Sequence, residues 1–386
     1  MKIAILGSTG SIGKTTVNII KKDKKNFEVI LLTTNNNYNE LLKQVKDLNP
    51  KNIVINNKLY FIYLKKKLKK KKINIFNNFN TFKKKYNKKI DFTMSAISGL
   101  AGLVPTIEAI SFSKKIAIAN KESIICAWNL IENSLKKNKC KFIPIDSEHF
   151  SINELLKNSN NSQVEQIIIT ASGGPFLNLP LKKFKKINPT MAIKHPRWKM
   201  GKKISVDSAT LMNKVFELIE ANKIFNIELK KLKILIHPNS YVHAIVKFNN
   251  GLSKILVHDT DMKIPIFNSL YDKNNKNLST KKLNLKNLNN LNFTNVDNKR
   301  FPLINLIKKI PKLNSLFETV IVSANDELVE LFLNNKISFL QISQILNKIT
   351  NLKEFLNYKK IYPKNLRQII DLNETVRLKT RFLSII

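Results

Sequence analysis

The chain has 386 residues, of which 43% are hydrophobic and 24% are charged, and its formal net charge is +40 at pH 7. This length is sufficient for two or three domains, each with its own core. No stretch reaches the roughly 18 consecutive apolar residues that a membrane-spanning helix requires, so we expect no association with a membrane.

The positive charge by itself would suggest a polyanionic partner such as nucleic acid. The lysines, however, occur together with many asparagines and isoleucines, as around the run from Lys65 to Lys72. All three residue types are encoded by A- and T-rich codons, so a biased base composition explains them together. Aromatic residues, which single-strand binders interleave with charge, are few around these runs. We therefore expect no nucleic-acid partner.

Two features bear on the cellular compartment. Cys126 and Cys140 have no metal-ligand spacing and are expected to be free thiols. The first residues enter an apolar stretch directly, which leaves no room for a signal or transit peptide. Both features predict a cytoplasmic protein.

Residues 3–6 form an apolar run typical of a buried parallel strand. A glycine-containing turn, residues 7–13, and a stretch with helical spacing, residues 14–20, follow it. Strand, turn and helix in this order present free N–H groups and a positive helix end to a phosphate. A P-loop requires glycine at position 8, where the chain has Ser8, and the dinucleotide fingerprint has one residue too many in its first gap. A purely structural turn is the third alternative.

The second predicted strand, residues 27–32, ends in Thr33-Thr34-Asn35-Asn36-Asn37. An NAD enzyme usually has an acid here that binds the ribose 2′-hydroxyl. No acid is present, which favours NADPH over NADH, although no Arg or Lys is present to bind the 2′-phosphate. These residues favour a Rossmann-type nucleotide site.

The α/β alternation continues along the first third of the chain. Further strands are expected at 53–55, 73–76, 91–97 and 115–119, with a helix at about 105–111. The last of these strands leads into Asn120-Lys121-Glu122-Ser123. Ligands of open α/β sheets bind at the carboxyl ends of strands, so this polar segment is a candidate for function.

Two acids, Asp146 and Glu148, follow the apolar pair Phe142-Ile143. In an extended segment alternate side chains share a face, so both carboxylates can point at one place. Such a pair favours a hard divalent cation between them. The alternative is a solvated turn with two surface acids.

The second third of the chain contains a cluster of small polar groups. A strand at 166–170 runs into Ser172-Gly173-Gly174-Pro175, and an irregular segment with His195, Trp198 and Met200 is expected to form a lid near 194–203. We expect one continuous helix from about residue 204 to 220. On it Asn213 and Glu217 are four residues apart and share a face, with Lys214 beside them. An exposed polar stripe is the alternative.

Five segments of the chain, by their order and spacing, resemble those of a known protein family, and the resemblance covers essentially the whole chain. The segments are Gly7–Gly13, Ala119–Ser123, Pro144–His149, Ser172–Phe176 and Gly201–Thr210. Together they resemble the 1-deoxy-D-xylulose-5-phosphate reductoisomerase family, whose members use NADPH and a divalent metal in the non-mevalonate isoprenoid pathway. Three segments depart from the family. Gly-Lys-Asn after the second strand reads Asn35-Asn36-Asn37, residues 150–153 after His149 differ from the usual run, and the late Asn-Ala-Ala-Asn-Glu appears within 322–327.

The resemblance implies a role for each matching residue. The metal ligands would be Asp146, Glu148 and Glu217, which with Lys121 and His195 would form the catalytic set. The substrate and its phosphate would contact Lys121, Ser147, Glu148, Ser172, His195, Ser208, Asn213, Lys214 and Glu217. The cofactor would contact Thr9, Gly10, Ser11, Ile12, Asn35, Asn36, Asn37, Asn120, Glu122 and Gly201.

It also implies an α/β fold with an N-terminal Rossmann-like parallel sheet, an α+β catalytic domain and a C-terminal helical domain. We expect the domains at 1–146, 147–271 and 303–386, with a linker at 272–302. The implied reaction is a metal-dependent retro-aldol and aldol rearrangement of 1-deoxy-D-xylulose 5-phosphate, followed by reduction with NADPH to 2-C-methyl-D-erythritol 4-phosphate. The metal would be Mn²⁺, Mg²⁺ or Co²⁺ and the assembly a homodimer.

Two alternatives remain at this point. One is another NADP-dependent Rossmann oxidoreductase of a small phosphorylated substrate. The other is a basic nucleic-acid-binding protein with a vestigial nucleotide fold.

Overall fold

The computed structural model describes residues 1–198, 200–271 and 276–385. These residues form two compact units. Unit 1 comprises Met1–Ser123, Ile131–Asp146 and Met262–Leu278, and unit 2 comprises Ile124–Leu130, Ser147–Asp261 and Ser279–Ile386. Lys199 of the predicted lid and residues 272–275 of the predicted linker lie outside the described residues. The division into four functional segments stays a prediction.

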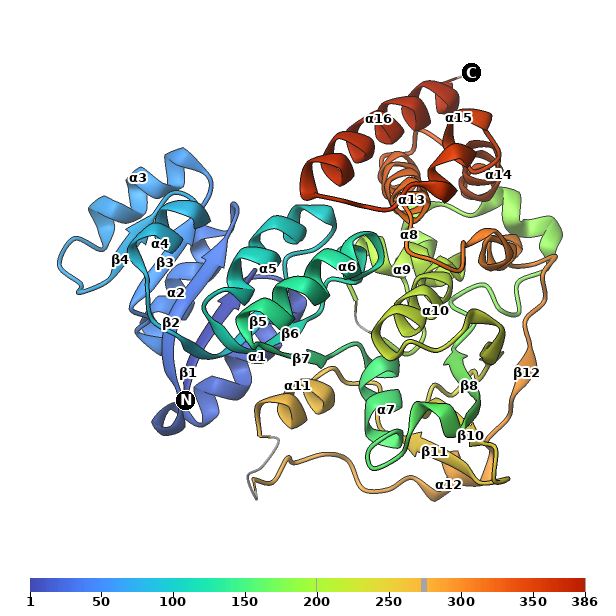
Figure 1. Cartoon of the computed structure of the whole chain (residues 1–386), viewed down its shortest axis with the longest axis horizontal. Coiled ribbons are helices and arrows are strands. Elements are labelled where there is room, and N and C mark those ends of the chain that lie inside the picture. Colours follow the sequence, from blue (N-terminus) through green and yellow to red (C-terminus); the bar gives the residue numbers. More distant parts are fainter. Residues whose placement is uncertain (199, 272–275, 386) are drawn as a thin grey trace. The chain divides into compact units, whose positions relative to one another are not determined.

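Unit 1 is built on a parallel sheet whose strand order is β4-β3-β2-β1-β5-β6-β7 (Figure 1). The strands are β1 (Lys2–Leu6), β2 (Glu28–Thr34), β3 (Asn52–Ile55), β4 (Asn74–Phe76), β5 (Ile90–Ser95), β6 (Ser113–Ile118) and β7 (Lys141–Pro144). The helices are α1 (Ser11–Lys22), α2 (Tyr38–Leu48), α3 (Lys58–Lys67), α4 (Phe79–Lys85), α5 (Leu103–Ile110), the two ends of α6 (Lys121–Asn138) and α11 (Lys263–Leu270). The predicted Rossmann-like sheet is confirmed.

The strand order reverses between β1 and β5, which are hydrogen-bonded neighbours. In open α/β sheets this switch point leaves a crevice at the carboxyl ends of the strands, where ligands bind. The core beneath it consists of fully buried apolar side chains, including Ile3, Ile5 and Phe92. These side chains explain why the strands read as nearly continuous apolar runs.

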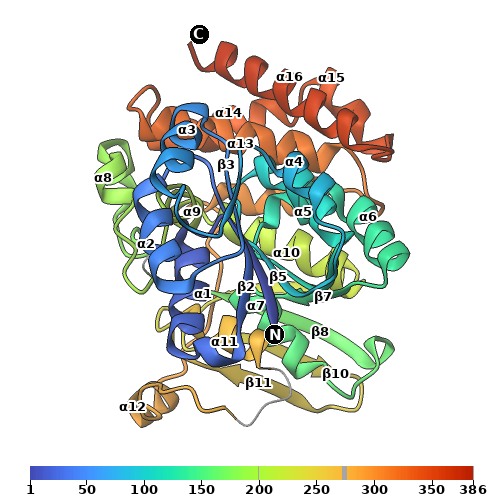
Figure 2. The same ribbon diagram turned by 90° about the vertical axis from the view of Figure 1, so that its left-hand side faces the viewer.

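Unit 2 contains a mixed sheet with strand order β11-β10-β8-β9-β12. Figure 2 labels its strands β8, β10 and β11. Its strands are β8 (Val164–Ala171), β9 (Leu232–Ile236), β10 (Val242–Phe248), β11 (Ser253–Val257) and β12 (Thr294–Asn295). Among the strand pairs described in this sheet, β8 and β9 run parallel and the others run antiparallel. The helices are α7 (Ser147–Leu155), α8 (Pro189–Ala192), α9 (Lys202–Ala209), α10 (Met212–Phe225), α12 (Leu285–Asn289), α13 (Phe317–Leu333), α14 (Phe339–Ile349), α15 (Lys353–Leu356) and α16 (Leu366–Ile385).

The expectation of one continuous helix through residues 204–220 is wrong. α9 ends at Ala209 and α10 begins at Met212, because Leu211 between them has a left-handed backbone with φ of 59°. A leucine rarely adopts this conformation, and the sequence has no glycine or proline at this point. The break was therefore not predictable from the sequence.

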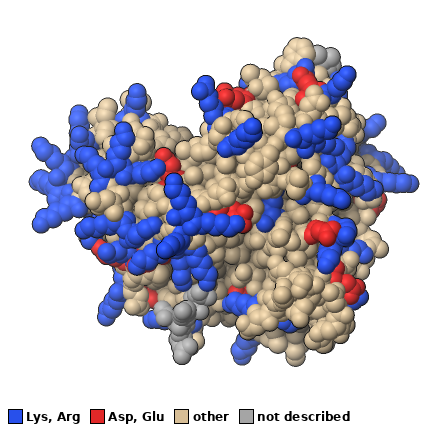
Figure 3. Space-filling view, in the orientation of Figure 1, with Lys and Arg blue, Asp and Glu red and all other residues tan. Residues whose placement is uncertain are grey.

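No helix among the described residues is long and apolar enough to cross a membrane. The two cysteines, Cys126 and Cys140, are buried free thiols. Lysine and arginine side chains are spread over the face drawn in Figure 3. This spread accords with charge that results from base composition.

Candidate active site

The glycine turn of unit 1 lies at the switch point of the sheet. Gly7 has φ of +73°, and a Cβ there would lie 2.7 Å from the carbonyl oxygen of Ala96, which follows β5. Gly13 is equally constrained, because a Cβ would clash with the Gly7 carbonyl oxygen. Glycine is therefore required at both ends of the turn. The turn brings the chain back against the neighbouring strand.

The turn leads into α1, and the backbone N–H groups at the start of this helix are uncapped. Gly10 is the N-cap residue, and no side chain accepts a hydrogen bond from the first turn among the described residues. The N–H groups of Ser11, Ile12 and Gly13 have no partner within the helix. The positive end of the helix dipole adds to them, so this position suits a phosphate or pyrophosphate.

The end of β2 contributes hydroxyl and amide groups beside this turn. The Gly7 N–H donates to Thr33 Oγ1 at 2.9 Å, and Thr9 Oγ1 lies 2.7 Å from Thr34 Oγ1. Asn35, Asn36 and Asn37 follow and are all exposed. The Asn37 side chain caps α2 by accepting from the Glu40 N–H.

The polar segment after β6 is tightly held. The Asn120 side chain caps α6 by accepting from the Ser123 N–H at 2.8 Å, and its amide donates to the carbonyls of Ile97 and Gly99. Lys121 and Glu122, in the first turn of α6, are each 7% exposed. Lys121 Nζ lies 3.2 Å from Asp146 Oδ2 in an ion pair within unit 1.

Asp146 and Glu148 come together in a way that the sequence reasoning did not anticipate. β7 ends at Pro144 and α7 begins at Ser147, so Glu148 lies in the first turn of a helix. The expected extended segment is therefore wrong. The strand-to-helix turn, rather than the alternation of a strand, brings the two carboxylates together.

Glu217 completes the group of acids. Asp146 is the residue at which unit 1 ends, and it is bonded directly to Ser147. One oxygen from each of Asp146, Glu148 and Glu217 lies within 4.8 Å of the others. Carboxylate oxygens at this spacing are donors that suit a hard divalent cation.

Lys214 neutralises two of these acids. Its ammonium donates to Glu148 Oε1 at 2.5 Å and to Glu217 Oε2 at 2.6 Å. All three side chains are less than a tenth exposed. Burial alone would lower the pKa of Lys214, but the two carboxylates outweigh burial and raise it above its ordinary value. Lys214 is therefore held as a cation.

Two further hydrogen bonds fix the orientation of the acids. Ser147 Oγ donates to Glu148, and Asn213 Nδ2 donates to Glu217 Oε1. The helical spacing of Asn213 and Glu217 predicts this second contact, and the structure contains it.

His149 and Glu220 support the acids and were missed by the sequence reasoning. His149 is fully buried, its Nε2 lies 2.9 Å from the backbone oxygen of Glu217, and its Nδ1 lies 3.5 Å from Glu220 Oε2. The spacing of three residues from Asp146 to His149 and from Glu217 to Glu220 was the available signal.

Ser172 and His195 form a second cluster. His195 Nδ1 accepts from the backbone N–H groups of Arg197 and Trp198 at 3.1 and 2.9 Å. The ring proton therefore resides on Nε2, which donates to Ser172 Oγ at 3.0 Å. Burial, followed by the positive charge of Lys214, lowers the pKa of His195 to about 4.

Ser208 lies beside this cluster on α9. A Cβ on Gly174, which has φ of +66°, would lie 2.8 Å from the Ser208 backbone oxygen. The Ser172-Gly173-Gly174 turn thus packs directly on α9, which explains the two glycines.

The predicted lid segment is anchored within unit 2. Arg197 Nε donates to the Pro238 carbonyl at 3.1 Å, and its Nη2 donates to Asn239 Oδ1 at 3.2 Å. The Trp198 ring packs edge-on against His243 with centroids 6.0 Å apart. Gly201 is exposed at the N-cap of α9, and nothing lies within 4 Å of a Cβ built there.

Three family models match the chain. "1-deoxy-D-xylulose 5-phosphate reductoisomerase" matches residues 3–128, its C-terminal domain matches residues 142–225, and "DXP reductoisomerase C-terminal domain" matches residues 258–379. A curated 1-deoxy-D-xylulose 5-phosphate reductoisomerase from Pelagibacter ubique is 57% identical over 386 residues, which is 100% of both chains. Another from a Thermoanaerobacter species is 37% identical and covers 98% of both chains.

Solved structures agree with these matches. The 1-deoxy-D-xylulose 5-phosphate reductoisomerase from Zymomonas mobilis in complex with NADPH has a TM-score of 0.89 and 33% identity, covering 99% of this chain and 98% of its own. A DOX-P reductoisomerase in complex with NADPH, fosmidomycin and magnesium has a TM-score of 0.92 and 29% identity, covering 100% of this chain and 98% of its own. The two alternatives that the sequence left open are not favoured.

The first prediction concerns His195. We expect its ring to titrate near pH 4 in the folded protein and near pH 6.5 in urea. The neutral form is favoured in the folded state, so the contribution of His195 to stability is complete above pH 6.5 and declines as the pH falls toward 4. NMR titration of the assigned His195 ring protons measures both values. A folded-state midpoint at or above 6.5 would contradict the hydrogen-bond arrangement.

The second prediction concerns the end of β2. Asn36→Lys introduces the lysine that the family resemblance leads us to expect at this position. Because an exposed ion pair is worth up to about 1 kcal/mol, NADPH should bind about fivefold more tightly. NADH has no 2′-phosphate and serves as the control, with unchanged affinity. Fluorescence titration with both cofactors measures the effect, and equal gains for both would show that position 36 does not face the 2′-phosphate.

Proposed function

The chain belongs to the 1-deoxy-D-xylulose 5-phosphate reductoisomerase family, and we propose that the acids around Lys214 are the catalytic centre at which it acts. It is an NADPH-dependent oxidoreductase that converts 1-deoxy-D-xylulose 5-phosphate to 2-C-methyl-D-erythritol 4-phosphate, a step of isoprenoid precursor synthesis. The observation that carries the assignment of the centre is the grouping of Asp146, Glu148 and Glu217 oxygens within 4.8 Å.

These three acids fit a divalent metal because they offer closely spaced carboxylate oxygens in a largely buried setting. They would hold the ion through one oxygen each. When bound, the cation withdraws electron density from the substrate's carbonyl and hydroxyl oxygens, and NADPH supplies the hydride. The metal is magnesium in the related structures, and we propose that Mn²⁺ and Co²⁺ also serve.

The phosphate of the substrate would be anchored by donors of unit 2. Ser172, Ser208, Asn213 and Lys214 offer two hydroxyls, an amide and an ammonium. The ammonium remains charged because its pKa is raised. Binding a phosphate that takes no part in the reaction fixes the orientation of the carbons that do.

His195 would bind the substrate as a neutral ring. Its Nδ1 is occupied by two backbone donors, so Nε2 keeps the proton and can donate it in a hydrogen bond. A neutral donor beside Ser172 orients an anionic or hydroxyl group without adding a charge near Lys214. His195 is thus suited to positioning rather than to proton transfer at neutral pH.

The segment around Trp198 would exclude water from the reaction. Arg197 holds it against the turn at Pro238-Asn239, and Trp198 contributes its ring. Excluding water protects the aldehyde formed in a retro-aldol and aldol sequence until hydride reaches it.

The cofactor would bind at the turn in unit 1. The N–H groups of Ser11 and Ile12 would bind its pyrophosphate, next to Thr9 and Gly10. Residues of three further segments would complete the contacts, namely Asn35, Asn36, Asn37, Asn120, Glu122 and Gly201.

Three further properties are part of the proposal. The buried free thiols support a reducing, cytoplasmic location. The spread of lysines supports the absence of a nucleic-acid partner. Resemblance to the family supports a homodimer, for which light scattering should give about twice the chain mass of 44.4 kDa. A mass equal to one chain at micromolar concentration would contradict the homodimer.

The third prediction tests the metal ligands. Glu217→Gln removes one anionic oxygen, so turnover of 1-deoxy-D-xylulose 5-phosphate should fall at least about 100-fold while the affinity for NADPH stays unchanged. Stopped-flow NADPH oxidation and a fluorescence titration measure the two quantities. Glu132→Gln, the same change at a partly exposed residue of α6, is the control and should leave turnover intact.

An assay of NADPH oxidation with this substrate, before and after removal of divalent metal with a chelator, tests the function as a whole. Oxidation should stop with the chelator and return with excess Mg²⁺. Near-normal turnover of Glu217→Gln, or oxidation that persists without metal, would reject the assignment.

A further inference from the structure

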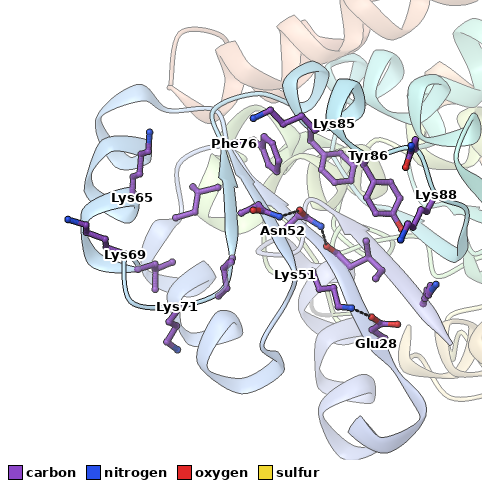
Figure 4. A pocket seen from close by; sticks show the side chains of 18 residues that line it. Glu28, Lys51, Asn52, Lys65, Lys69, Lys71, Phe76, Lys85, Tyr86 and Lys88 are labelled. Carbon is purple, nitrogen blue, oxygen red and sulfur yellow. Dashed lines mark hydrogen bonds and ion pairs between the residues drawn. The ribbon is translucent and has the colours of Figure 1, made fainter.

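Unit 1 contains a cavity of about 830 Å³ that the reductoisomerase reaction does not use (Figure 4). Lys2, Glu28, Asn52 and Asn74 line it, and they are the first residues of β1, β2, β3 and β4. The cavity therefore lies at the amino ends of the parallel strands. The glycine turn lies at the opposite end of β1, roughly 15 Å away for a strand of five residues.

Lysines dominate the lining. Seven of the lining residues are lysines, and Glu28 is the only acid among them. Lys51 forms an ion pair with Glu28. No carboxylate of the described residues lies within ion-pair distance of five others, which are Lys65, Lys69, Lys71, Lys85 and Lys88. Like charges around one cavity repel, so an anion bound there would be stabilised by several ammonium groups at once.

Helix chemistry accounts for only two of these five lysines. Lys65 and Lys85 lie in the last turns of α3 and α4, where a cation offsets the helix dipole. Lys69, Lys71 and Lys88 lie outside any helix. Figure 4 shows lysines on both sides of the cavity, from α3 and the following loop on one side and from α4 and its loop on the other.

An aromatic wall lies between the two groups of lysines. Tyr86 stacks on Phe82 with ring centroids 5.2 Å apart and an interplanar angle of 19°, and Phe76 packs edge-on against Phe82. Tyr86 is half-buried and is labelled beside Phe76 in Figure 4. Phe82 and Phe76 are buried and support Tyr86, whose partly exposed ring offers apolar contact to a planar base.

Side-chain amides complete the lining. Asn74 Nδ2 donates to Asn52 Oδ1 at 3.1 Å, and Asn52 Nδ2 donates to the Ile30 carbonyl at 2.9 Å. The side-chain oxygen of Asn74 accepts no hydrogen bond from the described residues. It remains an acceptor for an N–H group of a ligand.

We propose that this cavity binds a nucleoside polyphosphate, with its phosphates among the unpaired lysines and its base against Tyr86 and Asn74. The volume is in the range of small-ligand pockets, about 300–1,000 Å³. Phosphates alone would use the lysines but not the wall, and a neutral nucleoside would use the wall but not the lysines.

The fourth prediction tests this site by calorimetric titration with ATP. The full-length protein is saturated with NADPH, so that the turn after β1 is occupied, and the buffer contains chelator and about 150 mM salt to screen distant charges. ATP should bind more tightly than inorganic triphosphate, and adenosine should bind most weakly.

Two double variants provide a matched comparison. Lys65→Glu with Lys69→Glu changes two lining residues and should weaken ATP binding at least about tenfold. Lys66→Glu with Lys70→Glu changes two neighbours that do not line the cavity and should weaken it less than about twofold. Both pairs are four residues apart and change the net charge equally. Both variants should retain NADPH oxidation, because none of these lysines belongs to the catalytic centre.

Several results would overturn the proposal. They are undetectable binding of ATP to the unmodified protein, equal weakening in the two double variants, triphosphate binding as tightly as ATP, and displacement of NADPH by ATP. Competition by duplex DNA at this salt concentration would instead assign the lysines to nucleic acid.

Discussion

The proposed catalytic centre depends on one buried interaction, the contact of the Lys214 ammonium with the carboxylates of Glu148 and Glu217. Two ionised carboxylates about 4 Å apart repel by on the order of 4 kcal/mol where the effective dielectric constant is near 20. The same helix, α10, supplies both the cation and one of the acids, three residues apart. The Lys214 ammonium offsets this repulsion, so the two carboxylates can lie close together, as the ligands of one divalent cation must.

Two different kinds of group that can bind anions lie at opposite edges of the parallel sheet of unit 1. At its carboxyl edge, glycines at positions 7 and 13 allow the chain to turn back against β5, and uncapped backbone donors follow. At its amino edge, long cationic side chains surround a cavity. Backbone donors in a fixed turn recognise the geometry of a phosphate, whereas flexible lysines respond mainly to its charge.

Much of this organisation was predictable from the sequence, because it rests on local patterns. Apolar runs predict the strands, and a spacing of four residues predicts the contact of Asn213 with Glu217. Other features depend on backbone geometry that no local sequence pattern predicts. Leu211 breaks the predicted helix with a positive φ, and Ser147 begins a helix where an extended segment was expected. The lysine-lined cavity depends on strand order, which brings residues from four separate strands to one edge.

The most direct measurement of the central claim is the anomalous scattering of crystals grown with Mn²⁺. The account predicts one strong peak among the side-chain oxygens of Asp146, Glu148 and Glu217, and its loss in a variant that carries Glu148→Gln. A peak bound by other residues, or none in crystals that contain NADPH and substrate, would contradict the claim that these three acids form the metal site.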